Sequence, residues 1–345
     1  MRLSVLHAGY AQPHISWLAI DELADLLVHY FDAERLSPNR AKPGWRERLI
    51  GRGPARWDPV QTRGGDVLIV VAHDPQQLSM IEAVPQLRQR FARIHAWVTD
   101  SYFQSGFGRA TASFDSITVT AFEDAPYVRE RFGIAVHPLY QGADCLTWVP
   151  RQAHARSIDL IGFGRVPPSI HEGLVKTLHT ADAAPLYLHS PLGHLSGPVV
   201  RPERAMLFKL LQRSGISLAF HLHMEPQGQR PRSMMVTSRW LESLLSGCIV
   251  AGRRPLSRMA DEMLNWAGAT IELPEKSEDA VARLIELTQA REDMEWQRRT
   301  NMREMLLRHD WRHRIMSLCQ LWSLPVPAQL RADIERVHEL AAALA

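Results

Sequence analysis

Residues 230–255 have the sequence RPRSMMVTSRWLESLLSGCIVAGRRP, which predicts a loop, a short amphipathic helix, a glycine and a strand. The hydroxyl of Thr237 or Ser238 can cap the helix, because a short polar side chain satisfies a free backbone N–H at a helix start. Gly247 is expected to end the helix, and residues 248–252 (CIVAG) form the short apolar run of a buried parallel strand. Apolar residues at helical spacing predict one buried face: Trp240, Leu241, Leu244 and Leu245.

The first turn of this predicted helix carries two charged residues suited to binding a nucleotide. Arg239 and Glu242 lie three positions apart, so both project from one side of the helix. A helix N-terminus presents free N–H groups and partial positive charge to a diphosphate. A carboxylate one turn along can accept hydrogen bonds from ribose hydroxyls. An ordinary helix–strand unit with a solvated Glu242 explains these residues equally well when they are taken alone.

Length and composition indicate the class of protein. A chain of 345 residues exceeds one comfortable hydrophobic core and predicts two domains. The net charge of +3 suits a phosphorylated small molecule and is far from the charge of a nucleic-acid-binding protein. The cysteines form no disulfide framework and no metal spacing, which indicates a reducing compartment. No signal-peptide pattern and no apolar run of about 18 residues is present, so we expect a cytoplasmic protein that does not span a membrane.

Strands and helices alternate along both halves of the chain, which predicts an α/β fold with doubly wound parallel sheets. A strand, a glycine loop and a helix open the chain at Arg2, and the same order starts again at Arg156. We therefore expect a Rossmann-like domain over residues 1–150 and a second over residues 151–325. Pro325 and Pro327 then separate a terminal helix within residues 326–345.

The stretch from residue 230 to residue 255, called the organising stretch below, resembles the donor-binding segment of glycosyltransferases with the GT-B fold, in the glycosyl transferases group 1 superfamily and its CgeB-like branch. The matching residues are Ser238–Glu242 (SRWLE) and Ser246–Val250 (SGCIV). Residues 136–144, a strand followed by Gly-x-Asp, are similar to the family's domain crossover. This resemblance implies two Rossmann-like domains facing a cleft, a terminal helix that can return to the first domain, and transfer of a sugar from a nucleotide-diphosphate donor.

One departure from the family limits what the resemblance implies about mechanism. Many retaining members carry two glutamates about eight positions apart, the first of which faces the sugar. Glu242 matches the second, whereas Met234 occupies the position of the first. CgeB-like members often lack the first glutamate as well, so the family assignment stands. Whether the sugar keeps its configuration stays open.

The second half is predicted to bind the donor. Gly164 and Arg165 follow a predicted strand, where backbone and guanidinium can approach a phosphate, although Gly-x-Gly is also common in tight turns. Arg232 is a further phosphate candidate, with a solvated basic loop as the alternative. Arg239, Ser238 and Thr237 line the helix start, and Glu242 is the candidate ribose clamp.

The first half is predicted to bind the acceptor, because α/β sheets bind ligands at the carboxyl ends of their strands. Gly9 and Tyr10, which are predicted to contact the acceptor, follow the first strand. His73, a catalytic candidate together with Asp100, follows the second long strand. Asp100 lies in a Trp-x-x-Asp-Ser segment that resembles one in the CgeB-like branch, and a carboxylate there can deprotonate an acceptor hydroxyl. The alternative for Asp100, and for Asp74 beside His73, is capping of the next turn.

No cofactor and no metal is predicted. His221 and His223 share one face of a strand end, but no third ligand has suitable spacing, and GT-B members cover the diphosphate with helix dipoles and basic side chains. Two other functions stay open: a non-catalytic GT-B-like nucleotide-binding or assembly protein, and a nucleotide-sugar epimerase. The nucleotide base, the sugar and the acceptor (a glycan, lipid-linked sugar, protein or small molecule) are not specified by the sequence.

Overall fold

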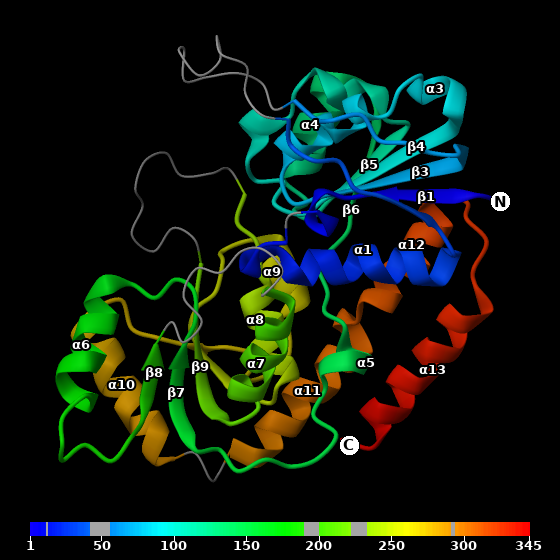
Figure 1. Ribbon diagram of the computed structural model, residues 1–345. Coiled ribbons are helices and arrows are strands. Elements are labelled where there is room, and N and C mark those ends of the chain that lie inside the picture. Colours follow the sequence, from blue (N-terminus) through cyan, green and yellow to red (C-terminus); the bar gives the residue numbers. More distant parts are fainter. Residues whose placement is uncertain (12, 42–55, 190–199, 222–232, 291–293) are drawn as a thin grey trace.

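The computed structural model describes residues 1–11, 13–41, 56–189, 200–221, 233–290 and 294–345. Two separate parallel sheets organise these residues (Figure 1). The six-stranded sheet has the order β2-β1-β3-β4-β5-β6, and the five-stranded sheet has the order β11-β10-β9-β7-β8. The first sheet contains β1 (Leu3–Leu6), β2 (Glu34–Leu36), β3 (Gly65–Ala72), β4 (Phe91–Val98), β5 (Ser116–Val119) and β6 (Ala135–Pro138). The second contains β7 (Ile158–Gly162), β8 (Tyr187–His189), β9 (Ser214–Phe220), β10 (Ile249–Arg253) and β11 (Ile271–Glu272).

Strand order fixes where each sheet can bind a ligand. Every pairing in both sheets is parallel, and consecutive connections reverse direction once in each sheet. The reversal lies between β1 and β3 in the first sheet and between β7 and β9 in the second. Ligands of doubly wound sheets bind outside the carboxyl ends of the strands at such a switch point. Residues 7–10 and 73–74 lie at the first switch point, and residues 163–165 lie at the second.

The first sheet is buried on both faces, because its strands are apolar on both sides. Helix α1 (Leu18–Phe31) covers one face together with α12 (Trp311–Leu321), a helix that comes from the far end of the chain. Elements η3 (Pro75–Ala83), η5 (Arg109–Ser113) and α4 (Asp124–Phe132) cover the other face. Two smaller elements, α3 (Leu87–Arg90) and η4 (Gln104–Gly106), connect the strands.

The second sheet is sandwiched in the same way. Helices α6 (Pro168–Leu178) and α10 (Ser277–Gln289) pack on one face. The other face is covered by α7 (Val200–Leu211), α8 (Ser238–Leu245) and α11 (Glu295–His309), with α5 (Cys145–Trp148) and α9 (Arg258–Met263) nearby. In α8 the predicted apolar face is completely buried, and Gly247 follows the helix with a φ of +73°. The organising stretch is therefore a central packing unit of this domain.

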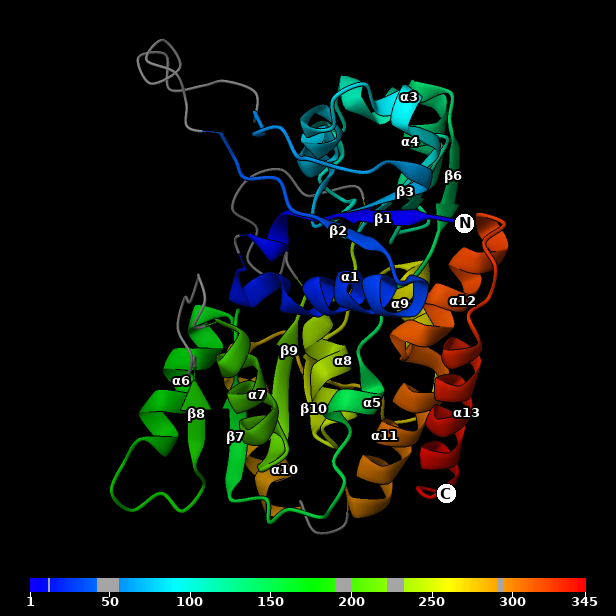
Figure 2. The same ribbon diagram turned by 45° about the vertical axis from the view of Figure 1, so that its right-hand side comes forward.

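The chain returns to the first sheet at its C-terminal end, as predicted. Asp310 begins α12, and the Arg312 guanidinium bonds Asp310 and Asp144 (2.8 Å for Asp144) and also reaches the Tyr30 hydroxyl of α1 at 2.6 Å. Helix α13 (Ala328–Ala342) continues beside α11 (Figure 2). Asp333 of α13 accepts a hydrogen bond from the Tyr30 hydroxyl at 2.8 Å. The buried charges Asp144, Asp310 and Arg312 thus fasten the crossover and the returning helix to each other.

One element lies in a different domain from the one expected from the sequence. Helix α12, grouped with the second domain on sequence grounds, packs on the first sheet. We propose the domain boundary near residue 150, between the end of β6 and the start of β7. Among the helices in the described residues, none combines the length and the apolar character that a membrane crossing requires.

Candidate functional site

The start of α8 faces the loop after β7, at the second switch point. Thr237 takes the N-cap position, but its hydroxyl makes no capping hydrogen bond. The Thr237 Oγ1 atom is buried and has no hydrogen-bond partner among the described residues. The predicted side-chain cap is therefore absent at Thr237, and a buried hydroxyl and the first backbone N–H groups of the helix, beginning at Ser238, lie together at this end.

Gly164 and Arg239 are in direct contact across this switch point. Gly164 has a φ of +69°, a conformation that glycine adopts without steric cost, and a Cβ built on it would lie 2.2 Å from Arg239 Nη2. The Arg239 guanidinium donates to the Arg165 carbonyl at 3.0 Å. Burial and the neighbouring Arg165 lower the pKa of Arg239 to about 10. The glycine loop and the helix start thus hold two guanidinium groups close together, which is the arrangement predicted for a phosphate site.

Asp100 belongs to the first domain and lies near these arginines. It follows β4, and its backbone N–H donates to the His73 carbonyl at 2.7 Å. Burial and the neighbouring Asp74 raise the pKa of Asp100 to about 7, while Arg165 and a hydrogen bond from the Tyr102 hydroxyl act in the opposite direction. Arg165 of the second domain therefore lies within electrostatic range of this carboxyl group of the first domain. A carboxyl group with a pKa near neutral can exchange protons at physiological pH.

Asp74 has the capping role that the sequence analysis weighed for it. Its side chain accepts hydrogen bonds from the backbone of Gln76 at 2.8 Å and Gln77 at 3.3 Å, at the start of η3. Pro75 occupies the first helical position, which suits its fixed φ. Asp74 therefore serves the fold and also contributes negative charge beside Asp100.

Glu242 is buried, with 4% of its surface exposed, and forms an ion pair with Arg204 of α7. Arg204 also bonds Glu22 of α1 through two nitrogen atoms, Nε at 2.9 Å and Nη2 at 3.1 Å. The solvated glutamate of the alternative interpretation is therefore not what the structure contains. Arg239 and Glu242 lie three positions apart on α8, yet the carboxylate forms its ion pair with Arg204 and not with Arg239.

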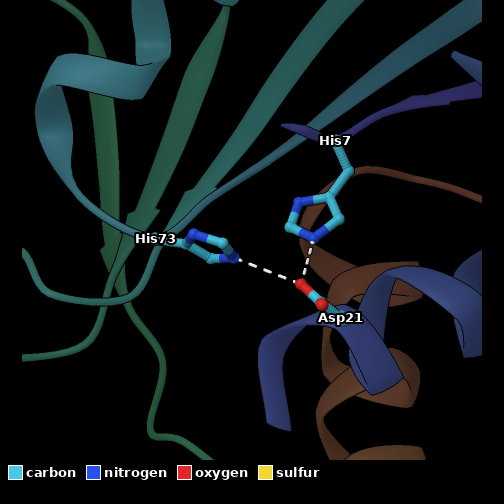
Figure 3. A group of neighbouring side chains, drawn as sticks. All are labelled: His7, Asp21 and His73. Atoms are coloured by element: carbon cyan, nitrogen blue, oxygen red, sulfur yellow. Dashed lines mark hydrogen bonds and ion pairs between the residues drawn. The ribbon is translucent and has the colours of Figure 1, made fainter. Parts of the chain in front are cut away.

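The first switch point is filled by a buried cluster of the protein's own side chains, shown in Figure 3. His7 Nε2 lies 2.7 Å from Asp21 Oδ1, and His73 Nε2 lies 3.3 Å from the same oxygen. Gly9 lies against this cluster, because a Cβ there would be 2.1 Å from Asp21 Oδ1. Tyr10 packs edge-on against His7, and burial raises the pKa of its hydroxyl. The predicted acceptor residues are thus adjacent.

Hydrogen bonds around this cluster define where its protons lie. The Val71 carbonyl, which can only accept, contacts His7 Nδ1 at 2.7 Å, so that nitrogen carries a proton. The backbone N–H of His73 donates to Gln77 Oε1 at 2.9 Å, which turns the Gln77 amide nitrogen toward His73 Nδ1 at 3.3 Å. His73 Nδ1 therefore accepts, and its proton lies on Nε2, directed at Asp21.

These protons decide what the cluster can bind. Two histidines and one carboxylate are ligand types that transition metals accept, and their ligand atoms lie within 4.8 Å of one another. A metal would need the lone pair of His73 Nε2, where the Gln77 contact favours a proton. Burial by itself would raise the pKa of Asp21, but hydrogen bonds from His7 and His73 lower it to about 2, while burial lowers the pKa of His73 to about 4. Because His7 Nδ1–H is already donated to Val71, the 2.7 Å contact between His7 Nε2 and Asp21 Oδ1 holds one proton between these two groups, and His73 Nε2–H is a second donor to Asp21.

The structure thus brings the predicted donor residues Gly164, Arg165, Ser238 and Arg239 together, with Asp100 opposite them. His73 and Gly9 lie in the neighbouring cluster. Arg232 lies outside the described residues.

Sequence reasoning missed two buried charged residues that organise these sites, Arg204 and Asp21. Each interrupts the apolar face of an amphipathic helix. Arg204 lies at helical spacing with Val200, Leu207 and Leu211, and Asp21 lies within the apolar start of α1. A charge on a buried face is rarely tolerated without a partner, so this position was the available signal.

Comparisons with known proteins give a family match to part of the chain and structural matches to its fold. Residues 173–320 match the family described as glycosyl transferase-like, and no curated protein sequence matches the chain. The structure of Anabaena Alr3699/HepE in complex with UDP-glucose superposes with a TM-score of 0.55 at 9% identity, covering 94% of this chain and 100% of that chain. The UDP complex of the same protein gives a TM-score of 0.52 at 11% identity with the same coverage.

A third similar structure covers a different share of its own chain. TarM from S. aureus gives a TM-score of 0.47 at 9% identity, over 74% of this chain and 53% of that chain, so this chain spans about half the length of TarM. From the HepE superpositions, the chain has the GT-B fold predicted from its sequence.

Proposed function

We propose that this protein is a glycosyltransferase that moves a sugar from a nucleoside diphosphate donor, such as a UDP-sugar, to an acceptor at the first domain. The observation that carries the proposal is the pair Arg165 and Arg239. Neither guanidinium forms an ion pair with a carboxylate among the described residues, and the proximity of Arg165 lowers the pKa of Arg239. Two guanidinium groups close together beside a helix N-terminus repel each other, and an anion that binds between them relieves this repulsion. A diphosphate provides that anion.

The donor is proposed to lie across the start of α8. Arg165 and Arg239 contact the diphosphate, and the backbone N–H groups at Ser238 with the unpartnered Thr237 hydroxyl complete its hydrogen bonds. Glu242 then accepts from the ribose hydroxyls one turn along the helix. These positively charged groups replace a metal ion at the diphosphate, so we expect transfer to proceed in the presence of EDTA.

The acceptor is proposed to lie against the carboxyl end of β4, where Asp100 acts as the general base. Its raised pKa matches this role, because a base works best when its pKa is close to the working pH. His73 has both ring nitrogens engaged, with Asp21 and with Gln77. We therefore assign His73, together with Gly9 and Tyr10, to shaping the acceptor side, and proton transfer to Asp100.

Support for donor chemistry comes from two directions. The family match lies in the half that contains Arg239 and Glu242. HepE, which has the same fold, was crystallised with UDP-glucose and with UDP. A non-catalytic nucleotide-binding protein would share the arginine pair and lack turnover. An epimerase would interconvert the free nucleotide sugar without an acceptor.

The test combines binding with turnover. UDP titrated into the protein should bind, and Arg239→Gln should raise its Kd by about 10- to 100-fold, since a hydrogen bond to a charged group contributes about 1.5–3 kcal/mol. Arg283→Gln is the matched control, because Arg283 lies on α10 in an exposed ion pair with Glu286. Release of UDP from UDP-sugars that increases with a panel of acceptors would establish transfer. UDP binding without any turnover would identify the non-catalytic alternative.

A further inference from the structure

Arg204 is a buried cation that joins carboxylates from both domains. Only 4% of its surface is exposed, and it lies on α7 of the second domain. Nη1 pairs with Glu242 Oε1, while Nε and Nη2 form a two-pronged contact with both oxygens of Glu22 on α1. Such a planar fork fixes the guanidinium in position and in orientation. The Glu242 carboxylate is therefore held by a group whose own position depends on the first domain.

Aromatic side chains pack against the Arg204 guanidinium. The Arg204 guanidinium lies 4.9 Å from the centre of the Phe208 ring, and Phe208 stacks on Trp148 at 4.4 Å with an angle of 1° between the ring planes. The Trp148 indole N–H donates to Glu22 Oε1 at 2.8 Å. Trp148 belongs to the crossover segment, so elements of the first domain, the second domain and the connection between them meet at this one cation.

Charge balance makes the three residues interdependent. One guanidinium serves two carboxylates, and burial raises the pKa of Glu22 although Arg204 lowers it. Removing Arg204 would leave Glu242 buried without a counter-charge, and a carboxylate in that position takes up a proton or turns away toward water. In either state Glu242 no longer presents an ionised acceptor at its original place.

We propose that Arg204 is a positioning residue that orients Glu242 for the donor ribose and links that contact to the seating of the first domain through Glu22. The inference rests on the proposed function, because it takes Glu242 as the ribose-binding carboxylate. Arg204 holds the Oε1 oxygen, and an ionised carboxylate has about four acceptor positions, so further acceptor positions remain for the ribose hydroxyls.

Arg201 supplies a matched control on the same helix. It lies one turn before Arg204 and also bonds α1, through Asp25 Oδ2 at 2.9 Å. Its side chain is 46% exposed, and it forms an ion pair with Asp25, not with Glu242. Loss of Arg201 therefore removes a contact between the domains without touching the proposed ribose site.

The experiment measures discrimination between UDP and 2′,3′-dideoxy-UDP, which lacks the ribose hydroxyls, by calorimetry. Wild type should bind UDP at least 10-fold more tightly than 2′,3′-dideoxy-UDP, so the ratio of the two Kd values should be at least 10. Arg204→Met should bring this ratio close to one by weakening UDP alone, and Arg201→Met should preserve it. Arg204→Lys, which keeps the charge and loses the fork, and Glu22→Gln in the first domain should each lower the ratio at least threefold. The two milder variants keep the test valid if Arg204→Met does not fold.

The outcomes separate this inference from the function on which it rests. Failure of wild type to bind UDP, or equal affinity for the two nucleotides, would overturn the ribose role of Glu242 itself. Discrimination in wild type that survives in Arg204→Met and Arg204→Lys would overturn the positioning role alone. A ratio unchanged in Glu22→Gln would overturn the link to the first domain.

Discussion

Replacing Asp100 by asparagine should separate the catalytic contribution of this residue from its effect on stability. Asp100 is partly buried at the end of β4, close to a second carboxylate, Asp74. Asparagine has nearly the same shape and can still accept a hydrogen bond from the Tyr102 hydroxyl. The change therefore removes the charge and the proton-accepting ability with little effect on packing.

The pKa of Asp100 sets the size of the stability effect. It rises from 3.8 to about 7, and each pKa unit corresponds to about 1.4 kcal/mol, so ionisation costs the fold up to about 4 kcal/mol. Between pH 3.8 and 7 the folded protein binds more protons than the unfolded chain, and its stability falls as the pH rises. Asp100→Asn should thus be the more stable protein at pH 8, by about 2 kcal/mol or more, and the difference should shrink toward pH 5.

Turnover should change in the opposite direction. Loss of a general base lowers the rate by about 10²-fold or more, so UDP release with acceptor present should fall by at least that factor while the Kd for UDP is unchanged. The wild-type rate should rise with pH up to about 7 and then level off. Asp74→Asn is the control: it keeps an oxygen that can cap η3 and removes the neighbouring charge, so the rising limb should move to lower pH with full activity retained.

Urea unfolding at pH 5 and pH 8, combined with initial rates across this range, decides the matter. An Asn variant that is less stable than wild type at pH 8 and nearly fully active would refute the reasoning and support a purely structural role for Asp100. A gain in stability accompanied by normal turnover would confirm that burial of the ionised Asp100 destabilises the fold, and it would exclude Asp100 as the general base.

Two further predictions concern the loop after β7 and the first switch point. Gly164→Ala should raise the Kd for UDP about 10-fold or more by displacing Arg239. Gly133→Ala is the control, because Gly133 has a similar φ of +66° and no heavy atom within 4 Å of an added Cβ, so it should cost the same roughly 1–2 kcal/mol of backbone strain without affecting binding. Equal effects of the two variants on UDP binding would contradict the contact between Gly164 and Arg239. Because the pKa of His73 is lowered to about 4 and the unfolded chain takes up that proton near 6.5, stability should fall by about 3 kcal/mol as the pH drops from 6.5 to 4. Measured in the Asp100→Asn background to remove the opposing titration, this loss should largely disappear on adding His73→Gln, and a persistent loss would assign it to other groups.

Much of the fold was determined by local pattern in the sequence. The apolar runs that became β3 and β10 are continuous because both faces of a doubly wound sheet are buried. The face of α8 was predictable from helical spacing, and its end from Gly247. The two sheets and the returning terminal helix were predicted from order and resemblance. The strands, the apolar face of α8 and its end at Gly247 depend on residues that are neighbours in sequence.

The candidate site was only partly predictable, for a physical reason. Gly164 and Arg239 could be named as candidates separately, but their contact depends on how β7 and α8 pack, and no sequence spacing encodes it. Asp100 could be placed at a strand end, whereas its raised pKa arises from burial and from Asp74, which comes from another strand connection. Electrostatic effects depend on distance in space and on exclusion of water, and both are set by the assembled domains.

The buried charge networks were decided by tertiary structure alone. Arg204 lies 182 residues from Glu22 and 38 from Glu242, and Arg312 lies 282 residues from Tyr30. From sequence, each is a charge that interrupts the apolar face of a helix, which signals a buried partner without identifying it. The sequence by itself determined which residues form strands and helices and which of them carry suitable chemistry. Only the packing of α1, α7 and α8 decided which carboxylates Arg204 holds, because an ion pair forms between groups that the fold brings together, however far apart they lie along the chain.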